Sequence, residues 1–166
     1  MAPQENQVVA ASGTATVPHR GTVIVSGLAS DAHTWNLVYL QLLIEELGYH
    51  VLNLGPCVPD DVLVEECRRA EPLLVALGSV NGHGYSDGLR VVRRLRACPE
   101  LCATTLVIGG KLTVCDEAPA RHARDLMAAG FDAVFPDRSS NTTDFEAFVA
   151  SLQAPAPQLS TSGRGA

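Results

Sequence analysis

The stretch TVIVSGLASDAH (residues 22–33) joins a short apolar run to a polar loop, and a longer apolar-rich segment follows it. The apolar run Thr22–Ser26 is typical of a buried strand. The segment His33–Leu47 has the pattern of a long helix, and Gly48 is the stop signal expected just past a helix C-terminus. This part of the chain therefore predicts a strand, a loop and a helix in succession, which is the start of an α/β fold.

The same alternation of apolar runs and amphipathic stretches continues along the chain. Further strands are predicted at His50–Leu54, Leu73–Leu77, Thr105–Ile108 and Ala133–Phe135. Further helices are predicted at Pro59–Ala70, Ser86–Arg96, Ala118–Ala129 and Thr143–Leu152, with Gly130 ending the third of these. Strands separated by helices form successive βαβ units with right-handed crossovers. We therefore expect a flavodoxin-like (Rossmann-like), doubly wound, five-stranded parallel sheet in the order 2-1-3-4-5.

The two ends of the 166-residue chain differ in composition from its middle. Residues 1–20 are rich in Ala, Thr, Ser, Gln and Pro and show no helical or strand periodicity, and residues 153–166 form a Pro, Ser, Thr and Gly segment. Such segments bury too little apolar surface to fold. The sequence predicts one domain over residues 21–152 between disordered N-terminal and C-terminal tails.

The charge and cysteine content exclude several classes of function. A net charge of −6 argues against a nucleic-acid partner, and the arginines of Arg90–Arg96 are interpreted as the solvated face of a helix. Five cysteines at irregular spacing fit a reducing cytoplasm, and only Cys98 and Cys102 lie close enough in sequence to suggest half of a zinc site. No signal peptide and no membrane span are evident, so a cytoplasmic location is expected.

Polar residues gather where predicted strands end, which is where open parallel sheets bind ligands. The loop after the first strand carries Ser30, Asp31 and His33. A carboxylate two residues before a histidine can hold one imidazole nitrogen while the other nitrogen binds a metal ion. The alternative is that Ser30 or Asp31 caps the following helix and that His33 is a surface residue in the first helical turn.

Glycines dominate the loops expected after the third and fourth strands. The segments Gly78–Gly84 and Gly109–Lys111 would allow a large ligand to approach the backbone closely, or would simply serve tight turns. No G-x-G-x-x-G motif follows the first strand, and the second strand ends at Asn53-Leu54-Gly55 without an acidic residue. No phosphate-binding P-loop is present either. A dinucleotide-binding fold is therefore disfavoured.

Three of these segments together resemble the D-x-H-x-x-G … S-x-L … G-G signature of cobalamin-binding domains. They are Asp31-Ala32-His33, Gly78-Ser79-Val80 and Gly109-Gly110. Within that group the chain is most similar to the small, cobalamin-binding subunits of glutamate (methylaspartate) mutases. The resemblance covers about residues 21–152 and extends to Leu52–Gly55 and Ala129–Pro136.

The resemblance implies a role for each of the matching residues. His33 would be the lower axial ligand of cobalt, with Asp31 bound to its other ring nitrogen. The nucleotide tail of the cofactor would lie in a slot between the sheet and the first helix, and His83 would lie against the corrin ring or a partner chain. The full set implied to bind the cofactor is Ser30, Asp31, Ala32, Thr34, Asn36, Gly78, Ser79, Val80, Asn81, Gly82, His83, Gly109, Gly110 and Lys111.

The chain departs from the signature at three positions. Asn36 stands where the signature has glycine, so that a side chain projects where the tail should pass. Gly78 stands where it has serine and lacks a hydroxyl that would contact the buried base, although Ser79 beside it could supply one. Val80 replaces leucine, which removes one methylene from an apolar wall.

The resemblance also implies an activity and a partner. The chain would be the cofactor-binding component of an adenosylcobalamin-dependent isomerase that converts L-glutamate to L-threo-3-methylaspartate by a radical rearrangement. Substrate would reach the site through a separate large catalytic subunit, as in a heterotetramer, and the isolated chain would not turn over. The alternatives are a cobalamin carrier or sensor, a corrinoid protein of a methyltransferase system, and a flavodoxin-like interaction module that binds no cobalamin. The short segment before the first strand leaves no room for the helical cap domain of the methyl-transfer proteins.

Overall fold

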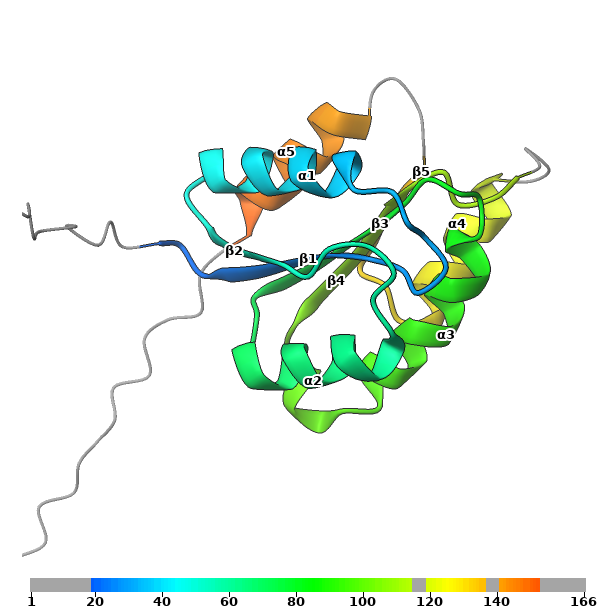
Figure 1. Ribbon diagram of the computed structural model, residues 1–166, viewed down its shortest axis with the longest axis horizontal. Helices are drawn as coiled ribbons and strands as arrows, with labels where there is room; N and C mark the ends of the chain where they lie inside the picture. The colour runs from blue at the N-terminus through cyan, green and yellow to red at the C-terminus, as the bar shows by residue number, and fades with distance from the viewer. Residues whose placement is uncertain (1–18, 115–118, 137–140, 153–166) are drawn as a thin grey trace, which may run out of the picture.

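The protein is described by a computed structural model over residues 19–114, 119–136 and 141–152 (Figure 1). Its strands are β1 (Thr22–Gly27), β2 (His50–Asn53), β3 (Leu74–Ser79), β4 (Thr105–Gly110) and β5 (Ala133–Pro136). Its helices are α1 (Trp35–Glu46), α2 (Asp60–Ala70), α3 (Gly84–Arg96), α4 (Pro119–Ala129) and α5 (Asn141–Ser151), with a short 3-10 helix η1 (Pro99–Leu101). The tails predicted at residues 1–20 and 153–166 lie, except for residues 19 and 20, outside the described residues.

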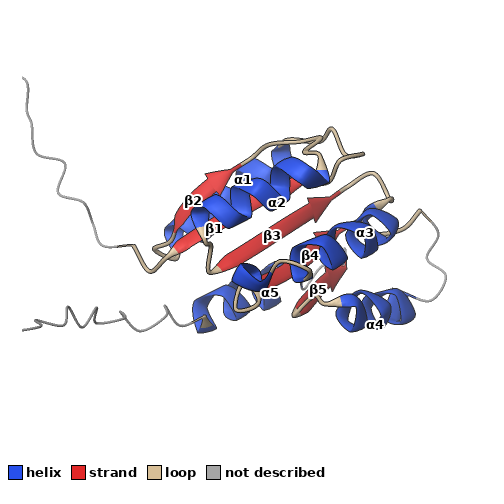
Figure 2. Cartoon of the chain, turned by 90° about the horizontal axis from the view of Figure 1, so that it is seen from below, coloured by secondary structure: helices blue, strands red, loops and turns tan. Residues whose placement is uncertain are grey.

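The strands form one parallel sheet in the order β2-β1-β3-β4-β5, which confirms the predicted flavodoxin-like topology. Figure 2 shows the strands running in the same direction between layers of helices. The chain reverses its direction of winding between β1 and β3, so their carboxyl ends border the switch point where such sheets bind ligands. Gly48 and Gly130 have φ values of +88° and +130°, as expected for glycines that end α1 and α4.

Helices α1 and α5 cover one face of the sheet, and α2, α3 and α4 cover the other (Figure 1). Because side chains alternate along a strand, Leu74 and Ala76 face α1 and α5, whereas Val75 and Leu77 face the other helices. Continuing the alternation places Gly78 on the α1 and α5 face and Ser79 on the opposite face. This difference decides what each residue can contribute to a ligand site.

Strands β3 and β4 are longer than the apolar runs predicted. Gly78 and Ser79 pair in register with Gly109 and Gly110. These four residues therefore end strands, whereas the sequence predicted that they lie in loops. Glycine weakens a strand in isolation, but the parallel ladder between two central strands supplies hydrogen bonds that fix its conformation.

The loop before α1 is also longer than predicted. Helix α1 begins at Trp35 with Thr34 as its N-cap, so His33 lies before the helix and neither Ser30 nor Asp31 caps it. The carbonyl of Thr34 accepts hydrogen bonds from the backbone N–H groups of Leu37 and Val38, which starts the helix there. The interpretation of His33 as a first-turn helical residue is therefore wrong. Helix α3, in contrast, starts two residues earlier than predicted, at Gly84.

Arg90, Arg93 and Arg94 of α3 are exposed, as predicted for a solvated helix face, and some of the arginines of this helix also form ion pairs with neighbouring elements. Arg90 bonds Asp60 of α2, Arg94 pairs with Asp61, and Arg96 bonds Asp132. These pairs neutralise much of the only basic run. The described cysteines, Cys57, Cys67, Cys98 and Cys102, are free thiols. Within the described ranges no helix is both long and apolar enough to cross a membrane.

Candidate functional site

Asp31 organises the loop between β1 and α1, and its carboxylate is buried, with a side chain only 2% exposed. Its Oδ2 accepts hydrogen bonds from the backbone N–H groups of Val80 (2.6 Å) and Asn81 (3.2 Å). Its Oδ1 accepts from the His33 backbone N–H (3.1 Å) and lies 2.6 Å from His33 Nδ1. Burial alone would raise the pKa of Asp31, but these hydrogen bonds outweigh it and lower the pKa to about 2. The carboxylate is therefore ionised at neutral pH.

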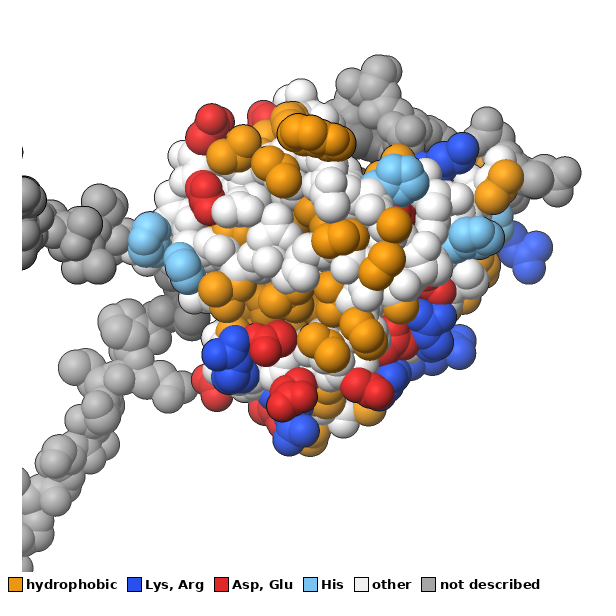
Figure 3. Space-filling view, viewed as in Figure 1, with side chains coloured by type: hydrophobic (Ala, Val, Ile, Leu, Met, Phe, Trp, Pro, Cys, Tyr) orange, Lys and Arg blue, Asp and Glu red, His pale blue; other side chains and the backbone are white. Residues whose placement is uncertain are grey.

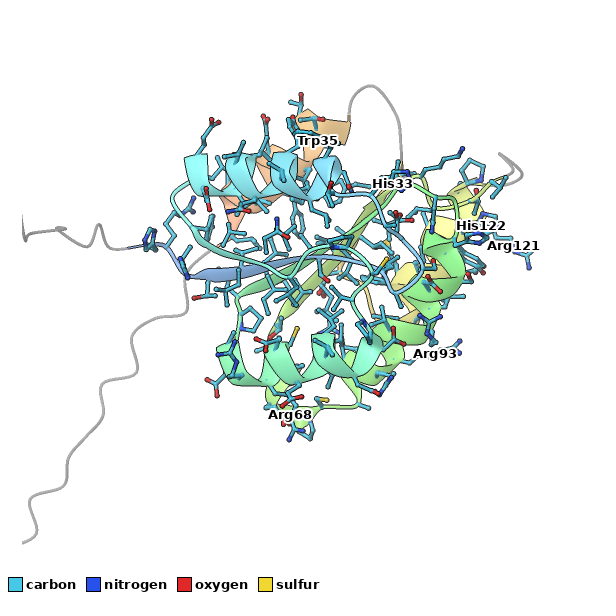
Figure 4. All side chains as sticks on the ribbon, viewed as in Figure 1. His33, Trp35, Arg68, Arg93, Arg121 and His122 are labelled. Atoms are coloured by element: carbon cyan, nitrogen blue, oxygen red, sulfur yellow. The ribbon has the colours of Figure 1, made fainter. Side chains whose placement is uncertain are left out.

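The His33 imidazole is held by Asp31 through one nitrogen and is exposed on the other side. Its side chain is 57% exposed. A proton on Nδ1 that is donated to Asp31 leaves Nε2 of the neutral ring with a free lone pair. Figure 4 shows His33 in the loop just before α1, close to Trp35 at the first position of that helix. The arrangement is that of an oriented, accessible nitrogen ligand.

A second polar cluster fixes the backbone of the same loop. The Ser30 hydroxyl donates to Asp87 of α3 at 2.5 Å, and the Asn81 amide donates to the Ser30 carbonyl at 2.7 Å. Arg90 bonds Asp87 and Asp60, so the cluster reaches α2. Asp87 is buried and its pKa is lowered: burial opposes ionisation, but the bonds from Ser30 and Arg90 outweigh it. Sequence reasoning missed this cluster, because Asp87 and Asp60 carry no motif.

A cavity of about 320 Å³ opens beside this loop, between the sheet and helices α1 and α5. Its walls are mostly apolar and include Leu40, Phe135 and Phe145. Of the residues predicted to bind a cofactor, it is lined by Asn36, Gly78, Ser79, Val80, Gly109, Gly110 and Lys111. The predicted residues outside its lining are Ser30, Asp31, Ala32, Thr34, Asn81, Gly82 and His83, which lie in the loops after β1 and β3.

Several lining residues were not predicted from the sequence. Tyr39 and Leu40 follow Asn36 at helical spacing, and Phe135 is the register partner of Gly109 in β5. The three- and four-residue spacing along α1 was a usable signal. The position of Phe145 on α5 follows only from the packing of that helix on the sheet.

The hydroxyl of Ser79 does not face the cavity, which corrects the prediction that it replaces a hydroxyl at position 78. Its side chain lies against α3, where a Cβ at Gly84 would come within 2.8 Å of Ser79 Oγ. The Ser79 hydroxyl donates to Asn81 Oδ1 at 3.3 Å. Only the backbone of Ser79 can therefore line the cavity.

The glycines at the end of β4 and in the segment after β3 are each close to other atoms of the protein. A Cβ at Gly82 would lie 2.7 Å from the Val114 side chain, and one at Gly109 would lie 3.0 Å from the Phe135 carbonyl oxygen. Close packing within the protein, against Val114 and against Ser79, therefore accounts for Gly82 and Gly84 without a ligand. Gly110 is the most constrained of them, with φ +92° and a Cβ position 2.1 Å from the Ser79 carbonyl oxygen.

Replacement of Gly110 by alanine is expected to lower the free energy of unfolding by about 3 kcal/mol, because the new methyl group collides with backbone that cannot move aside. Gly55→Ala is the matched control: it has φ +83° but no atom within 4 Å, so it should cost only about 1 kcal/mol of backbone strain. Urea denaturation of both variants measures the difference. Equal losses in the two variants would contradict the steric account of Gly110.

Apolar side chains are exposed on the outer face of α1. Trp35 is 84% exposed, and Tyr39 and Leu42 are about half exposed. The space-filling view shows hydrophobic groups gathered on the side of the molecule that includes α1 (Figure 3). The loop that carries His33 leads directly into this face.

The chain is similar to known proteins in sequence and in fold. No protein-family model matches the chain. The glutamate mutase sigma subunit of Halobacterium salinarum is 30% identical over 132 residues, which cover 80% of this chain and 85% of that protein. Glutamate mutase sigma subunit 2 of Haloarcula marismortui is 26% identical over 131 residues, covering 79% and 87%.

Solved structures with similar folds fall into two groups. A cobalamin-binding protein from Desulfitobacterium hafniense superposes with a TM-score of 0.62 at 22% identity, over 78% of this chain and 57% of that one. A response regulator of the LuxR family from Aurantimonas superposes with a TM-score of 0.56 at 19% identity, over 82% and 90%. At these identities the matches establish the shared fold alone. The sequence match over most of both chains goes further: this chain belongs to the glutamate mutase sigma subunit family.

Proposed function

We propose that the chain is the cobalamin-binding subunit of an adenosylcobalamin-dependent glutamate (methylaspartate) mutase. The observation that carries the proposal is the His33–Asp31 pair, held at 2.6 Å in the loop after β1, with Asp31 bonded to the backbone of Val80 in the cavity wall. His33 Nε2 would bind cobalt, and Asp31 would fix the ring and its tautomer. The relationship to glutamate mutase sigma subunits supports the choice of reaction.

The residues present fit a metal that brings most of its ligands with it. Among the described residues no group of three or more His, Cys, Asp or Glu side chains lies close enough to hold a metal ion. One oriented imidazole would be sufficient for a metal already held by a macrocycle, because the protein would need to supply only one further ligand. His33 meets that requirement.

The cavity fits the nucleotide tail of such a cofactor. Its volume of about 320 Å³ lies within the range of small-molecule sites, and walls such as Leu40 and Phe145 suit an aromatic base. Lys111 also lines it and would place a positive charge near the phosphate of the tail. The cavity lies on the α1 and α5 face, beside the loop that carries His33.

When bound, adenosylcobalamin supplies the cleavage of its own cobalt–carbon bond, and the protein supplies position and electrostatics. In this chain, Asp31 holds the His33 ring, and the backbone N–H groups of Val80 and Asn81 hold Asp31. The Ser30–Asp87 bond holds the loop. A large catalytic subunit would bind the amino-acid substrate and cover the exposed side of this site, as the relationship to glutamate mutase sigma subunits suggests. Trp35, two residues after His33, and Val80, whose backbone N–H bonds Asp31, are exposed apolar residues that would suit such a contact.

Gel filtration of the purified chain mixed with aquocobalamin tests the proposal. We expect corrin absorbance to elute with the protein. If it does not, the proposal is wrong and the chain is a flavodoxin-like module that binds no cobalamin. Addition of a large mutase subunit and adenosylcobalamin should then give a cofactor-dependent complex that converts glutamate to methylaspartate, because linkage requires each partner to raise the other's affinity. Cobalamin binding without any mutase activity would instead identify a carrier or sensor.

A further inference from the structure

Two departures from the cobalamin-binding signature meet in space. Asn36, in the first turn of α1, stands where the signature has glycine, and Gly78, in β3, stands where it has serine. A Cβ at Gly78 would lie 2.7 Å from Asn36 Nδ2 and 3.2 Å from a methyl carbon of Leu37. The Asn36 carboxamide therefore fills the space that a side chain at position 78 would need. The two substitutions depend on each other.

The neighbouring residues of β3 leave this part of the cavity without another hydroxyl. Gly78 has no side chain, and the Ser79 side chain lies on the opposite face of the sheet against Gly84. Next to Gly78, the polar side chain that the described cavity wall contributes is therefore that of Asn36.

The Asn36 carboxamide is not satisfied by the protein. Its Oδ1 is buried and has no hydrogen-bond partner among the described residues, although the residue lines the cavity. A buried polar atom without a partner is costly, and most such atoms in folded proteins are bonded. A polar group that enters the cavity would supply the missing bond.

We propose that Asn36 hydrogen-bonds the heterocyclic base of the nucleotide tail, so that α1 contributes the polar contact that the signature assigns to β3. The inference rests on the proposed function, since it requires a corrinoid whose tail enters the cavity. A carboxamide has both an acceptor oxygen and N–H donors, and a half-turn about its last bond exchanges them. Asn36 can therefore donate to an unprotonated ring nitrogen or accept from an N–H of the base.

Asn36→Leu tests the polar role, because leucine keeps the branched shape of asparagine and removes its hydrogen bonds. We expect the dissociation constant for cobalamin to rise about tenfold, which corresponds to one lost hydrogen bond. The melting temperature of the free protein should stay the same or rise, because a buried unpaired oxygen is removed. Affinity for cobinamide, a corrinoid without the nucleotide tail, should not change. If Asn36 had a merely structural role, its replacement by leucine would lower the stability of the protein and its affinities for both cobalamin and cobinamide.

The reciprocal variant Asn36→Gly with Gly78→Ser tests the exchange. Gly78→Ser alone should weaken cobalamin binding at least tenfold, because its Cβ collides with Asn36, and the double variant should recover to within about threefold of the wild type. Wild-type affinity for cobalamin in Asn36→Leu, or an equal loss for cobinamide, would overturn the inference and leave the proposed function intact. Failure of the wild-type protein to bind either corrinoid would overturn the proposed function, and the inference with it. The Asn36→Leu comparison stands even if the Gly78→Ser variant does not fold.

Discussion

Replacement of His33 by alanine is expected to raise the dissociation constant for cobalamin by more than about 100-fold. Loss of a group that merely orients a metal ligand costs 10- to 100-fold, so loss of the ligand itself should cost more. The His33 side chain is mostly exposed and, within the described part of the chain, bonds only Asp31, so the stability of the free protein should change little.

His50→Ala is the matched control for this prediction. His50 is an exposed histidine at the start of β2, at the opposite end of the sheet from the site. Titration of both variants with aquocobalamin, followed by absorbance, gives the two affinities, and circular dichroism checks the fold. A His33→Ala protein that binds within a few-fold of the wild type would show that His33 is not the ligand.

Asp31→Asn is expected to lower the free energy of unfolding by about 3 kcal/mol at neutral pH. The amide cannot accept all the hydrogen bonds that Val80, Asn81 and His33 direct at the carboxylate, and it brings N–H groups against those donors. Cobalamin affinity should also fall, by the 10- to 100-fold typical of a lost orienting group. Asp144→Asn, an exposed aspartate on α5, should change stability by less than about 0.5 kcal/mol.

The effect of Asp31 on stability should depend on pH in one direction. The pKa of Asp31 is about 2 in the folded protein, below its ordinary value of 3.8, so the folded state favours the ionised form. Its stabilisation, about 2 kcal/mol by linkage, is complete above the unfolded pKa and is lost as the pH falls from about 4 to about 2. Urea denaturation should show that the difference in free energy of unfolding between the wild type and Asp31→Asn becomes smaller as the pH falls over that range. A difference that stays constant down to pH 2 would contradict the account.

The strands and their order could be predicted from the sequence because short apolar runs alternate with helical patterns along the chain. The ends of β3 and β4 could not, since Gly78 and Gly110 carry no strand preference and are held by pairing with each other's strand. The predicted start of α1, at His33, was wrong for a related reason. Asp31 looked like a cap because its partners Val80 and Asn81 are far away in the sequence.

The candidate site was predictable in part. The spacing of Asp31 and His33 indicated their bond, and the structure places Asn36 on the cavity wall as expected. From the sequence, the changes at Asn36 and Gly78 looked like two separate departures from the signature, an added side chain in the path of the tail and a missing hydroxyl. Only the packing of α1 on β3 shows that one side chain occupies the space left by the other.

The central claim, that His33 binds cobalt, is tested most directly by electron paramagnetic resonance of the cob(II)alamin complex with isotopically labelled histidine. Cobalt bound to an axial nitrogen shows splitting from that nucleus, so ¹⁵N-labelling of the protein's histidines should change triplet splittings to doublets. His33→Ala should lose the protein-derived splitting altogether, whereas His50→Ala should keep it. Splittings that remain triplets in the labelled protein would mean that cobalt keeps its own base or another ligand, and the account of this site would be wrong.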